Sequence, residues 1–176
     1  MAMPMKKPQT ISLDQQQAVA ALLFKEARFI DNQQWDEWIE LFDQQAEYWI
    51  PSWDGQHQLV DDPRTGISLM YYADRSGIED RIFRIRTGLS SASSPLPRTV
   101  HSITNIEVEA LDGGQLFVRS NWQCMSYRWK VTTTFVGHYE HTLKPAGDGS
   151  DNYLITRKRI VVKNDLIPIP MDIYNV

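Results

Sequence analysis

Two histidines and a carboxylate lie close together in the segment His138-Tyr139-Glu140-His141 and could supply ligands for a metal ion. Imidazole and carboxylate groups are the donors that zinc and non-haem iron use in proteins. In a strand, however, successive side chains point to opposite faces, so the odd spacing directs His138 and His141 apart. Without a bulge between them they cannot chelate one ion. The pattern therefore predicts no metal site here.

A second group of residues could form an acid–base pair. Asp31, Asp36 and Tyr48 come from the first third of the chain, and His101 comes from a later, strand-rich region. A hydrogen bond from a carboxylate would prepare the imidazole for general acid–base catalysis. In the structural alternative, the two aspartates cap and solvate a helix while His101 forms a hydrogen bond in the core or in an interface. We favour this alternative and predict no catalytic residue.

Four arginines in the middle of the chain could pair with carboxylates, because the planar guanidinium fits a carboxylate well. The carboxylates could belong to a partner subunit. A solvated helix face would show the same pattern, but the Ser- and Pro-rich segment 90–97 beside them is more typical of a contact loop. The four are Arg81, Arg84, Arg86 and Arg98.

Other catalytic signatures are missing from the sequence. It contains no nucleophile motif, no phosphate-binding glycine-rich loop and no dinucleotide fingerprint. It does contain six Trp and seven Tyr. Large aromatic residues without catalytic partners favour a subunit interface, where Trp, Tyr and Arg are enriched.

Composition places the chain among ordinary globular proteins. Its 176 residues, 42% hydrophobic and 23% charged, suffice for one domain with an apolar core. The net charge of -4 gives no electrostatic reason to bind nucleic acid. Cys124 is the only cysteine, which excludes an intramolecular disulfide and a cysteine-based metal cluster. Apolar runs typical of a signal peptide or a membrane span are missing, so we expect a cytoplasmic protein without a membrane partner.

The elements that position these residues begin with helices. Ser12 and Gln15 form a capping-box pattern, and apolar residues then recur at helical spacing up to Ile30. Residues 1–11 are expected to be a flexible tail and 12–176 a single domain. Asp31 or Asn32 would cap a second helix that folds back on the first. Its predicted buried stripe is Trp35, Trp38, Ile39 and Phe42.

Short strands are predicted over 47–50, ending at Pro51, and over 67–72, with a polar loop between them. Ser76 and Glu79 repeat the capping-box pattern for a third helix, and Gly88 is a natural end for it. The apolar face of that helix would hold Ile78, Ile82 and Ile85.

From about Thr99 onward the pattern is that of long strands, over about 99–110, 115–129, 132–143 and 153–162, with turns at 112–114 and 145–151. Helices followed by antiparallel strands predict an α+β fold with the helices against one face of a sheet. Strands of this length coil and curve. A curved antiparallel sheet closed by N-terminal helices forms a cone, the shape of nuclear-transport-factor-2-like and cystatin-like folds.

A set of short motifs follows one another along the chain. They are Glu26-Ala27-Arg28 through Asp31, Trp35-Asp36-Glu37-Trp38, Tyr48-Trp49-Ile50-Pro51, the segment from Glu79 to Gly88, Pro97-Arg98-Thr99-Val100-His101, Ile103-Thr104-Asn105-Ile106, Tyr127-Arg128, and Thr156-Arg157-Lys158-Arg159-Ile160. Over about residues 19–176 this set resembles the small (β) subunits of Rieske-type aromatic-ring-hydroxylating dioxygenases. The segments 49–54 and 169–176 are most similar to the benzoate, toluate and anthranilate branch, whereas 137–141 departs from many relatives in carrying histidines.

The resemblance implies a cone-shaped, non-catalytic subunit that binds no cofactor. It also implies a larger α subunit with a Rieske 2Fe-2S cluster and a mononuclear Fe(II), typically in an α3β3 hexamer. A separate reductase would supply electrons from NADH, and the substrate would be a benzoate-like acid. One cysteine agrees with this division, because a Rieske centre needs two Cys and two His.

The segment 81–101 and the apolar tail 167–176 are expected to contact the other subunits. Pro168 and Pro170 exclude the tail from a sheet interior, and an apolar tail exposed on a monomer would be a liability. Alternatively, the tail covers the chain's own core. Two other functions stay open: a stand-alone dehydratase or isomerase that uses Asp31 and His101, and a module that holds an aromatic ligand. The predicted interface residues are Arg81, Arg84, Arg86, Arg98, His101, Ile173 and Tyr174.

Overall fold

In the part of the chain that the structure describes, a curved six-stranded sheet and three α-helices make up the fold. The structure, a computed structural model, describes residues 10–88, 93–147 and 152–176. In chain order the elements are α1 (Leu13–Asp31), α2 (Trp35–Ile39), β1 (Phe42–Pro51), β2 (Ser68–Tyr72), α3 (Arg75–Arg86), β3 (Arg98–Ala110), the 3-10 turn η1 (Asp112–Gly114), β4 (Leu116–Arg128), β5 (Val131–Pro145) and β6 (Tyr153–Val162).

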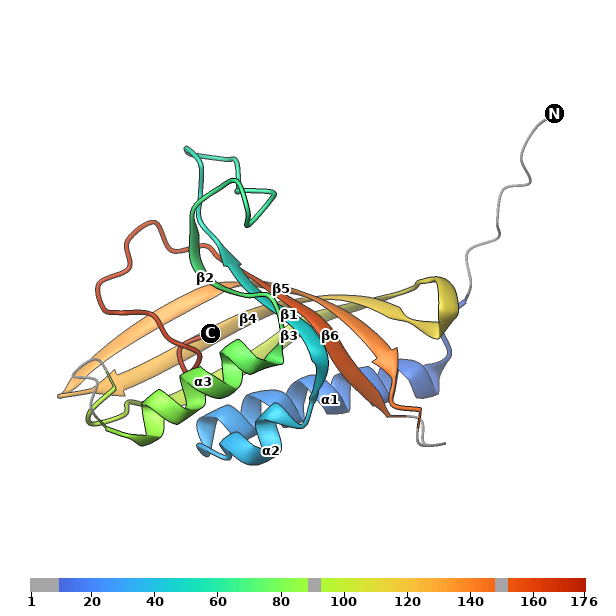
Figure 1. Ribbon diagram of the computed structural model, residues 1–176, viewed down its shortest axis with the longest axis horizontal. Coiled ribbons are helices and arrows are strands. Elements are labelled where there is room, and N and C mark those ends of the chain that lie inside the picture. Colours follow the sequence, from blue (N-terminus) through green and yellow to red (C-terminus); the bar gives the residue numbers. More distant parts are fainter. Residues whose placement is uncertain (1–9, 89–92, 148–151) are drawn as a thin grey trace.

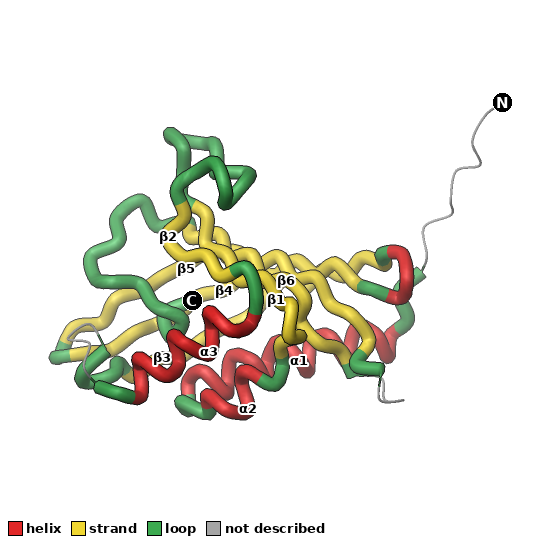
Figure 2. The backbone as a smooth tube through the Cα atoms, viewed as in Figure 1, coloured by secondary structure: helices red, strands yellow, loops and turns green. Residues whose placement is uncertain are grey.

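All three helices lie on one face of the sheet, and the loop between β1 and β2 projects from the opposite side (Figures 1 and 2). The strand order is β2-β1-β6-β5-β4-β3. Neighbouring strands are antiparallel except β1 and β6, which are parallel. Inward-facing residues of the long strands are buried at alternate positions beneath the helices. The predicted α+β fold with a curved sheet is confirmed.

Helix α1 begins as predicted. The Ser12 hydroxyl accepts a hydrogen bond from the Gln15 backbone N–H, and the Gln15 side chain accepts one from the Ser12 N–H. The prediction for the second helix was too long. Its N-cap is Gln34 rather than Asp31 or Asn32, it ends at Ile39, and Phe42 already belongs to β1. Phe42 is still buried against Trp38, since a strand can bring it to the same side of the core.

Helix α3 buries Ile78, Ile82 and Ile85, as predicted. Its start differs from the prediction, because Asp74 and not Ser76 is the N-cap: the Asp74 carboxylate accepts hydrogen bonds from the Ser76 N–H and hydroxyl. The helix ends before Gly88, whose φ of 64° is readily adopted by glycine.

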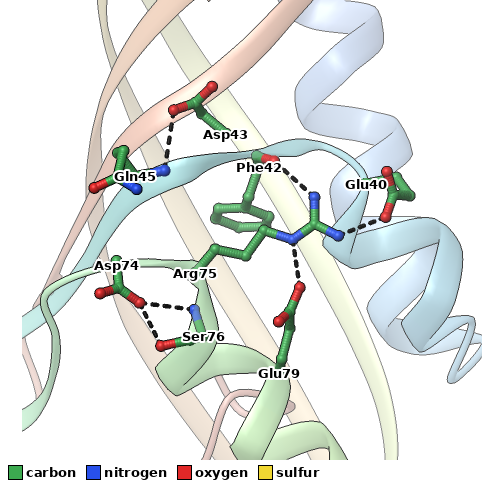
Figure 3. A network of polar contacts seen from close by, with 8 residues as sticks. All are labelled: Glu40, Phe42, Asp43, Gln45, Asp74, Arg75, Ser76 and Glu79. Atoms are coloured by element: carbon green, nitrogen blue, oxygen red, sulfur yellow. Dashed lines mark hydrogen bonds and ion pairs between the residues drawn. The ribbon is translucent and has the colours of Figure 1, made fainter.

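The buried Arg75 joins α3 to the preceding elements (Figure 3). Its guanidinium donates to Glu79 at 2.8 Å, to Glu40 at 2.5 Å and to the carbonyl of Phe42 at 3.2 Å. These contacts tie α3 to the end of α2 and the start of β1, so the three elements form one wall of the cone.

Some predictions fall on undescribed residues: most of the N-terminal tail 1–11, part of the proposed contact loop 90–97, and residues 148–151 of the turn after β5. Within the described part of the chain, no helix is long and apolar enough to cross a membrane.

Candidate functional site

Asp31 and His101 meet where the end of α1 packs against β3. His101 Nδ1 lies 2.6 Å from Asp31 Oδ1, and the His101 backbone N–H donates to Asp31 Oδ2 at 2.9 Å. The Thr99 hydroxyl also donates to Asp31 Oδ1, at 2.9 Å. Thr99 was not predicted to be a site residue, although its position two residues before His101 places both side chains on the same face of the strand.

The other two members of the predicted acid–base group lie elsewhere. Asp36 pairs with Arg86 at the surface, at 2.8 Å. Tyr48 is buried beside Trp38 and Phe42 in the aromatic core. The structure therefore brings together one pair of the four candidates, Asp31 and His101.

The geometry of this pair favours a structural role. Both oxygens of Asp31 accept hydrogen bonds from β3, so the carboxylate fastens the helix end to the sheet. The His101 side chain is 1% exposed, and its Nε2 has no hydrogen-bond partner among the residues that the structure describes. A substrate cannot reach that nitrogen in this conformation. Cys124, the cross-strand neighbour of His101, lies with its sulfur 4.0 Å from the Tyr174 carbonyl of the tail.

We expect Asp31→Ala to lower the free energy of unfolding by about 3 kcal/mol, because it leaves the donors of Thr99 and His101 unsatisfied. Denaturant unfolding measures this loss. The matched control is Asp36→Ala, which breaks an exposed ion pair and should change stability by about 0.5 kcal/mol. Equal effects of the two variants would contradict a fastening role for Asp31.

A second polar cluster lies in the middle of the cone and joins α1, β5 and β6. The Lys158 ammonium donates to Glu26 Oε1 at 2.7 Å, and His141 Nε2 lies 3.4 Å from Glu26 Oε2. All three side chains are at most 3% exposed. Lys158 Nζ also lies 4.2 Å from the centre of the Tyr139 ring, which adds a cation–π contact.

The charges of this cluster compensate one another. Burial raises the pKa of Glu26, but Lys158 and His141 together outweigh it and lower the pKa from 4.5 to about 2. For His141 burial is the largest influence, and it lowers the pKa below 6.5. Glu26 is therefore an anion paired with the Lys158 cation, and His141 is neutral near pH 7. The sequence carried a signal that was missed, namely that Glu26 falls within the buried stripe of α1 between Leu23 and Ile30.

His138 and His141 point to opposite faces of β5, as their spacing predicts. His141 is buried in the cone, whereas His138 Nε2 lies on the outer face, 3.5 Å from Glu140 Oε1. Glu140 also pairs with Arg159 at 2.9 Å. Across residues 10–88, 93–147 and 152–176, no three His, Cys, Asp or Glu side chains are grouped so that they could hold a metal ion.

The C-terminal tail returns into the cone after β6. Arg81 Nε donates to Asp172 Oδ1 at 2.7 Å, and a second guanidinium nitrogen pairs with Oδ2. Asp172 is 1% exposed, and Ile173, Asn175 and Val176 are fully buried. The Asn175 side chain donates to the Ser126 hydroxyl of β4 at 3.2 Å. Residues 172–176 thus fill the inner side of the sheet near β4.

The seven predicted interface residues differ in their burial and in their partners within the chain. His101, Ile173 and Tyr174 are buried within their own chain, and Arg81 and Arg86 pair with Asp172 and Asp36. Arg84 and Arg98 are exposed. The interface stays a prediction, and exposure makes these last two arginines the members best placed for it.

The curved sheet, the helices on one face and the polar groups inside define an α+β cone of the nuclear-transport-factor-2-like class. The family described as "Ring hydroxylating beta subunit" matches residues 25–169. The chain belongs to this family.

Individual relatives agree with this membership. The chain is 46% identical to the 2-halobenzoate 1,2-dioxygenase small subunit of Burkholderia cepacia, over 90% of this chain and 94% of the relative. It is 44% identical to the benzoate 1,2-dioxygenase subunit beta of Acinetobacter baylyi, over 95% of both chains. The crystal structure of the beta subunit of a benzoate 1,2-dioxygenase from Burkholderia mallei is 38% identical, with a TM-score of 0.76, and covers 96% of this chain and 99% of that one.

Proposed function

We propose that this chain is the β subunit of a ring-hydroxylating dioxygenase that acts on a benzoate-like acid, and that its role there is structural. The observation that carries the proposal is the identity of 44–46% with β subunits of benzoate and 2-halobenzoate dioxygenases, over at least nine tenths of each chain. The buried ion pair and the Arg81–Asp172 contact support a rigid scaffold, because both hold distant parts of the chain together.

The chemistry belongs to a larger α subunit, which carries a Rieske 2Fe-2S cluster and a mononuclear Fe(II). The two kinds of subunit form an α3β3 hexamer in the cytoplasm, and a separate reductase passes electrons from NADH to the α subunit. One cysteine supports this division, because a Rieske centre takes two cysteine and two histidine ligands.

A second candidate function rests on the 2.6 Å contact between Asp31 and His101. Such a pair could serve a small dehydratase or isomerase as a general base. The burial of His101 Nε2 weighs against it, because a base must come within hydrogen-bond reach of the proton that it removes.

Co-expression with a candidate α subunit tests the two functions. We expect a mixed complex whose mass fits α3β3, iron that follows the α subunit, and NADH-dependent oxidation of benzoate once the reductase is added. The purified β chain alone should convert no substrate. Turnover of a small aromatic or ketone substrate by the β chain alone, abolished by His101→Ala, would establish the second candidate instead.

A further inference from the structure

The end of the β4–β5 hairpin and the C-terminal tail enclose a cleft of ≈ 500 Å³. Its walls include Trp129 and Val131 of the hairpin, and Ile169 and Pro170 of the tail. Figure 1 shows the chain after β6 looping out beside β4 and β5 before it turns into the cone. Small-molecule sites in proteins typically have volumes of about 300–1,000 Å³, so this hairpin–tail cleft has room for a small organic ligand.

The walls of the hairpin–tail cleft are largely apolar and include two aromatic side chains. One is Tyr174 of the tail, which is 4% exposed. The other is Trp129, which is 72% exposed and lies in the turn between β4 and β5 with φ of 51°. Bulky side chains rarely adopt this left-handed conformation, and residues held in it cluster at ligand sites. Because most of the Trp129 indole lies outside the protein core, its position favours a role in binding rather than in folding.

Arg128 gives the cleft its charge. Among the described residues that line the cleft it is the only charged one, and none of them carries a carboxylate. One guanidinium nitrogen donates to the Ser94 carbonyl at 2.7 Å, and the guanidinium carbon lies 4.2 Å from the centre of the Trp129 ring. A carbonyl is neutral, so the Ser94 contact orients the side chain without cancelling its charge. A guanidinium has five N–H donors, so Arg128 can bind an anion in the cleft and keep the contact with Ser94.

The chemistry of these walls selects one class of small molecule. A flat apolar ring fits the apolar walls, and a carboxylate fits the planar guanidinium of Arg128 through two parallel hydrogen bonds. A cationic ligand would be repelled by Arg128. A wholly apolar ligand would cover the guanidinium without pairing it, which costs free energy. A dianion such as a phosphate ester would need further cations, which the described walls lack.

We propose that the hairpin–tail cleft binds a small aromatic carboxylate of the benzoate class without converting it. The carboxylate pairs with Arg128, and the aromatic ring lies against the Trp129 indole. The inference deepens the proposed function, on which the choice of benzoate rests, because benzoate-like acids are the substrates proposed for the dioxygenase. A ligand that binds only the folded state stabilises it, so the β chain becomes more stable as the concentration of the acid rises.

Isothermal titration of the purified β chain with benzoate tests the cleft. We expect saturable binding of one benzoate per chain with a Kd of about 0.1–1 mM, which is ordinary for so small a ligand. Benzamide has the same shape without the charge and should bind at least about 10-fold more weakly, because hydrogen bonds between charged groups are the stronger ones. Benzoate should also change the fluorescence of Trp129.

Two variants locate the site. Arg128→Met removes the guanidinium and should weaken benzoate binding about 10-fold or more, so that benzoate loses its advantage over benzamide. Trp129→Asn removes the indole and should weaken the binding of both ligands and abolish the fluorescence change. The fold is retained, because Asn suits the left-handed turn better than Trp does, and thermal melting checks this for each variant. Arg119→Met is the matched control: Arg119 lies on the same strand, is 54% exposed and does not line the cleft, so its loss should change the Kd less than about two-fold.

The outcomes separate the cleft from the proposed function. If the wild-type chain binds no benzoate up to about 10 mM, or if both variants bind it as the wild type does, the cleft proposal is wrong, and the function stands as long as the mixed complex oxidises benzoate. If the chain binds benzoate but forms no complex with the α subunit, the function fails and the cleft remains a binding site. Trp129→Asn could instead leave benzoate binding intact and weaken association with α or with a second copy of the chain, as measured by sedimentation. The cleft would then be a protein contact, and its assignment to a small molecule would be overturned.

Discussion

We expect the substitution Lys158→Met to lower the free energy of unfolding by about 3–5 kcal/mol, because it leaves the buried Glu26 carboxylate without its cation. Glu26 and Lys158 are 2% and 1% exposed, so water cannot take over the role of either partner. Since folded domains are stable by only about 5–15 kcal/mol, this loss endangers the fold. Urea unfolding of the purified chain measures it.

Two controls show whether charge rather than volume causes the loss. Adding Glu26→Leu to Lys158→Met removes both charges and should restore much of the stability, since apolar replacements of a buried ion pair are often neutral. Arg157→Met removes the neighbouring cation of the same strand, whose pair with Glu47 is partly exposed, and should cost at most about 1 kcal/mol. If the double variant were as unstable as Lys158→Met alone, lost packing would be the cause.

The same cluster makes stability fall on acidification. The pKa of His141 is lowered in the folded state. Below about pH 6.5 the unfolded state therefore binds a proton more readily than the folded state does, and the free energy of unfolding falls as the pH is lowered. The pKa of Glu26 falls from 4.5 to about 2, so its contribution is complete above pH 4.5 and is lost as the pH approaches 2. In Glu26→Leu with Lys158→Met, the loss between pH 4.5 and 2 should be smaller.

Features that depend on contacts between residues close in sequence could be predicted, whereas features that depend on distant parts of the chain could not. The capping box at Ser12 and the stripe Ile78, Ile82 and Ile85 depend on neighbours within one helix, and both were predicted correctly. Phe42 was assigned to a helix because its spacing from Trp38 fits one. Its actual place in β1 depends on pairing with Ile155 of β6, far along the chain.

The interior charges show the same limit more sharply. Asp31 and His101 were recognised as a possible pair from their residue types, but the contact that fastens Asp31 to Thr99 requires α1 to pack on β3. Glu26 and Lys158 are 132 residues apart in sequence. Only the folded cone brings them together. Taken singly in the sequence, a Glu or a Lys is the type of residue that normally lies at the solvated surface. A charged residue inside a buried stripe is the one sequence signal that would have identified Glu26.

Deletion of residues 172–176 is expected to lower the free energy of unfolding by about 5 kcal/mol or more. Ile173 and Val176 are fully buried and Tyr174 is 4% exposed. Burying such a side chain contributes about 1.5–3 kcal/mol, and the deletion also leaves Arg81 without Asp172. Thermal melting of the β chain alone measures the loss.

Two point variants show whether the loss of stability comes from buried side chains. Ile173→Ala should cost about 2–4 kcal/mol through the cavity that it leaves. Leu166→Ala, at a position just before the tail that is 72% exposed, should change the melting temperature little. Sedimentation with the α subunit then tests the expectation that the tail itself contacts other subunits. If the shortened chain melted like the wild type and lost only its affinity for α, the tail would be a contact segment and its burial in the cone would contribute little to stability. We expect instead that the shortened chain melts at a lower temperature than the wild type. Asp172 pairs with Arg81 of α3, and Ile173 packs in the core of the same chain.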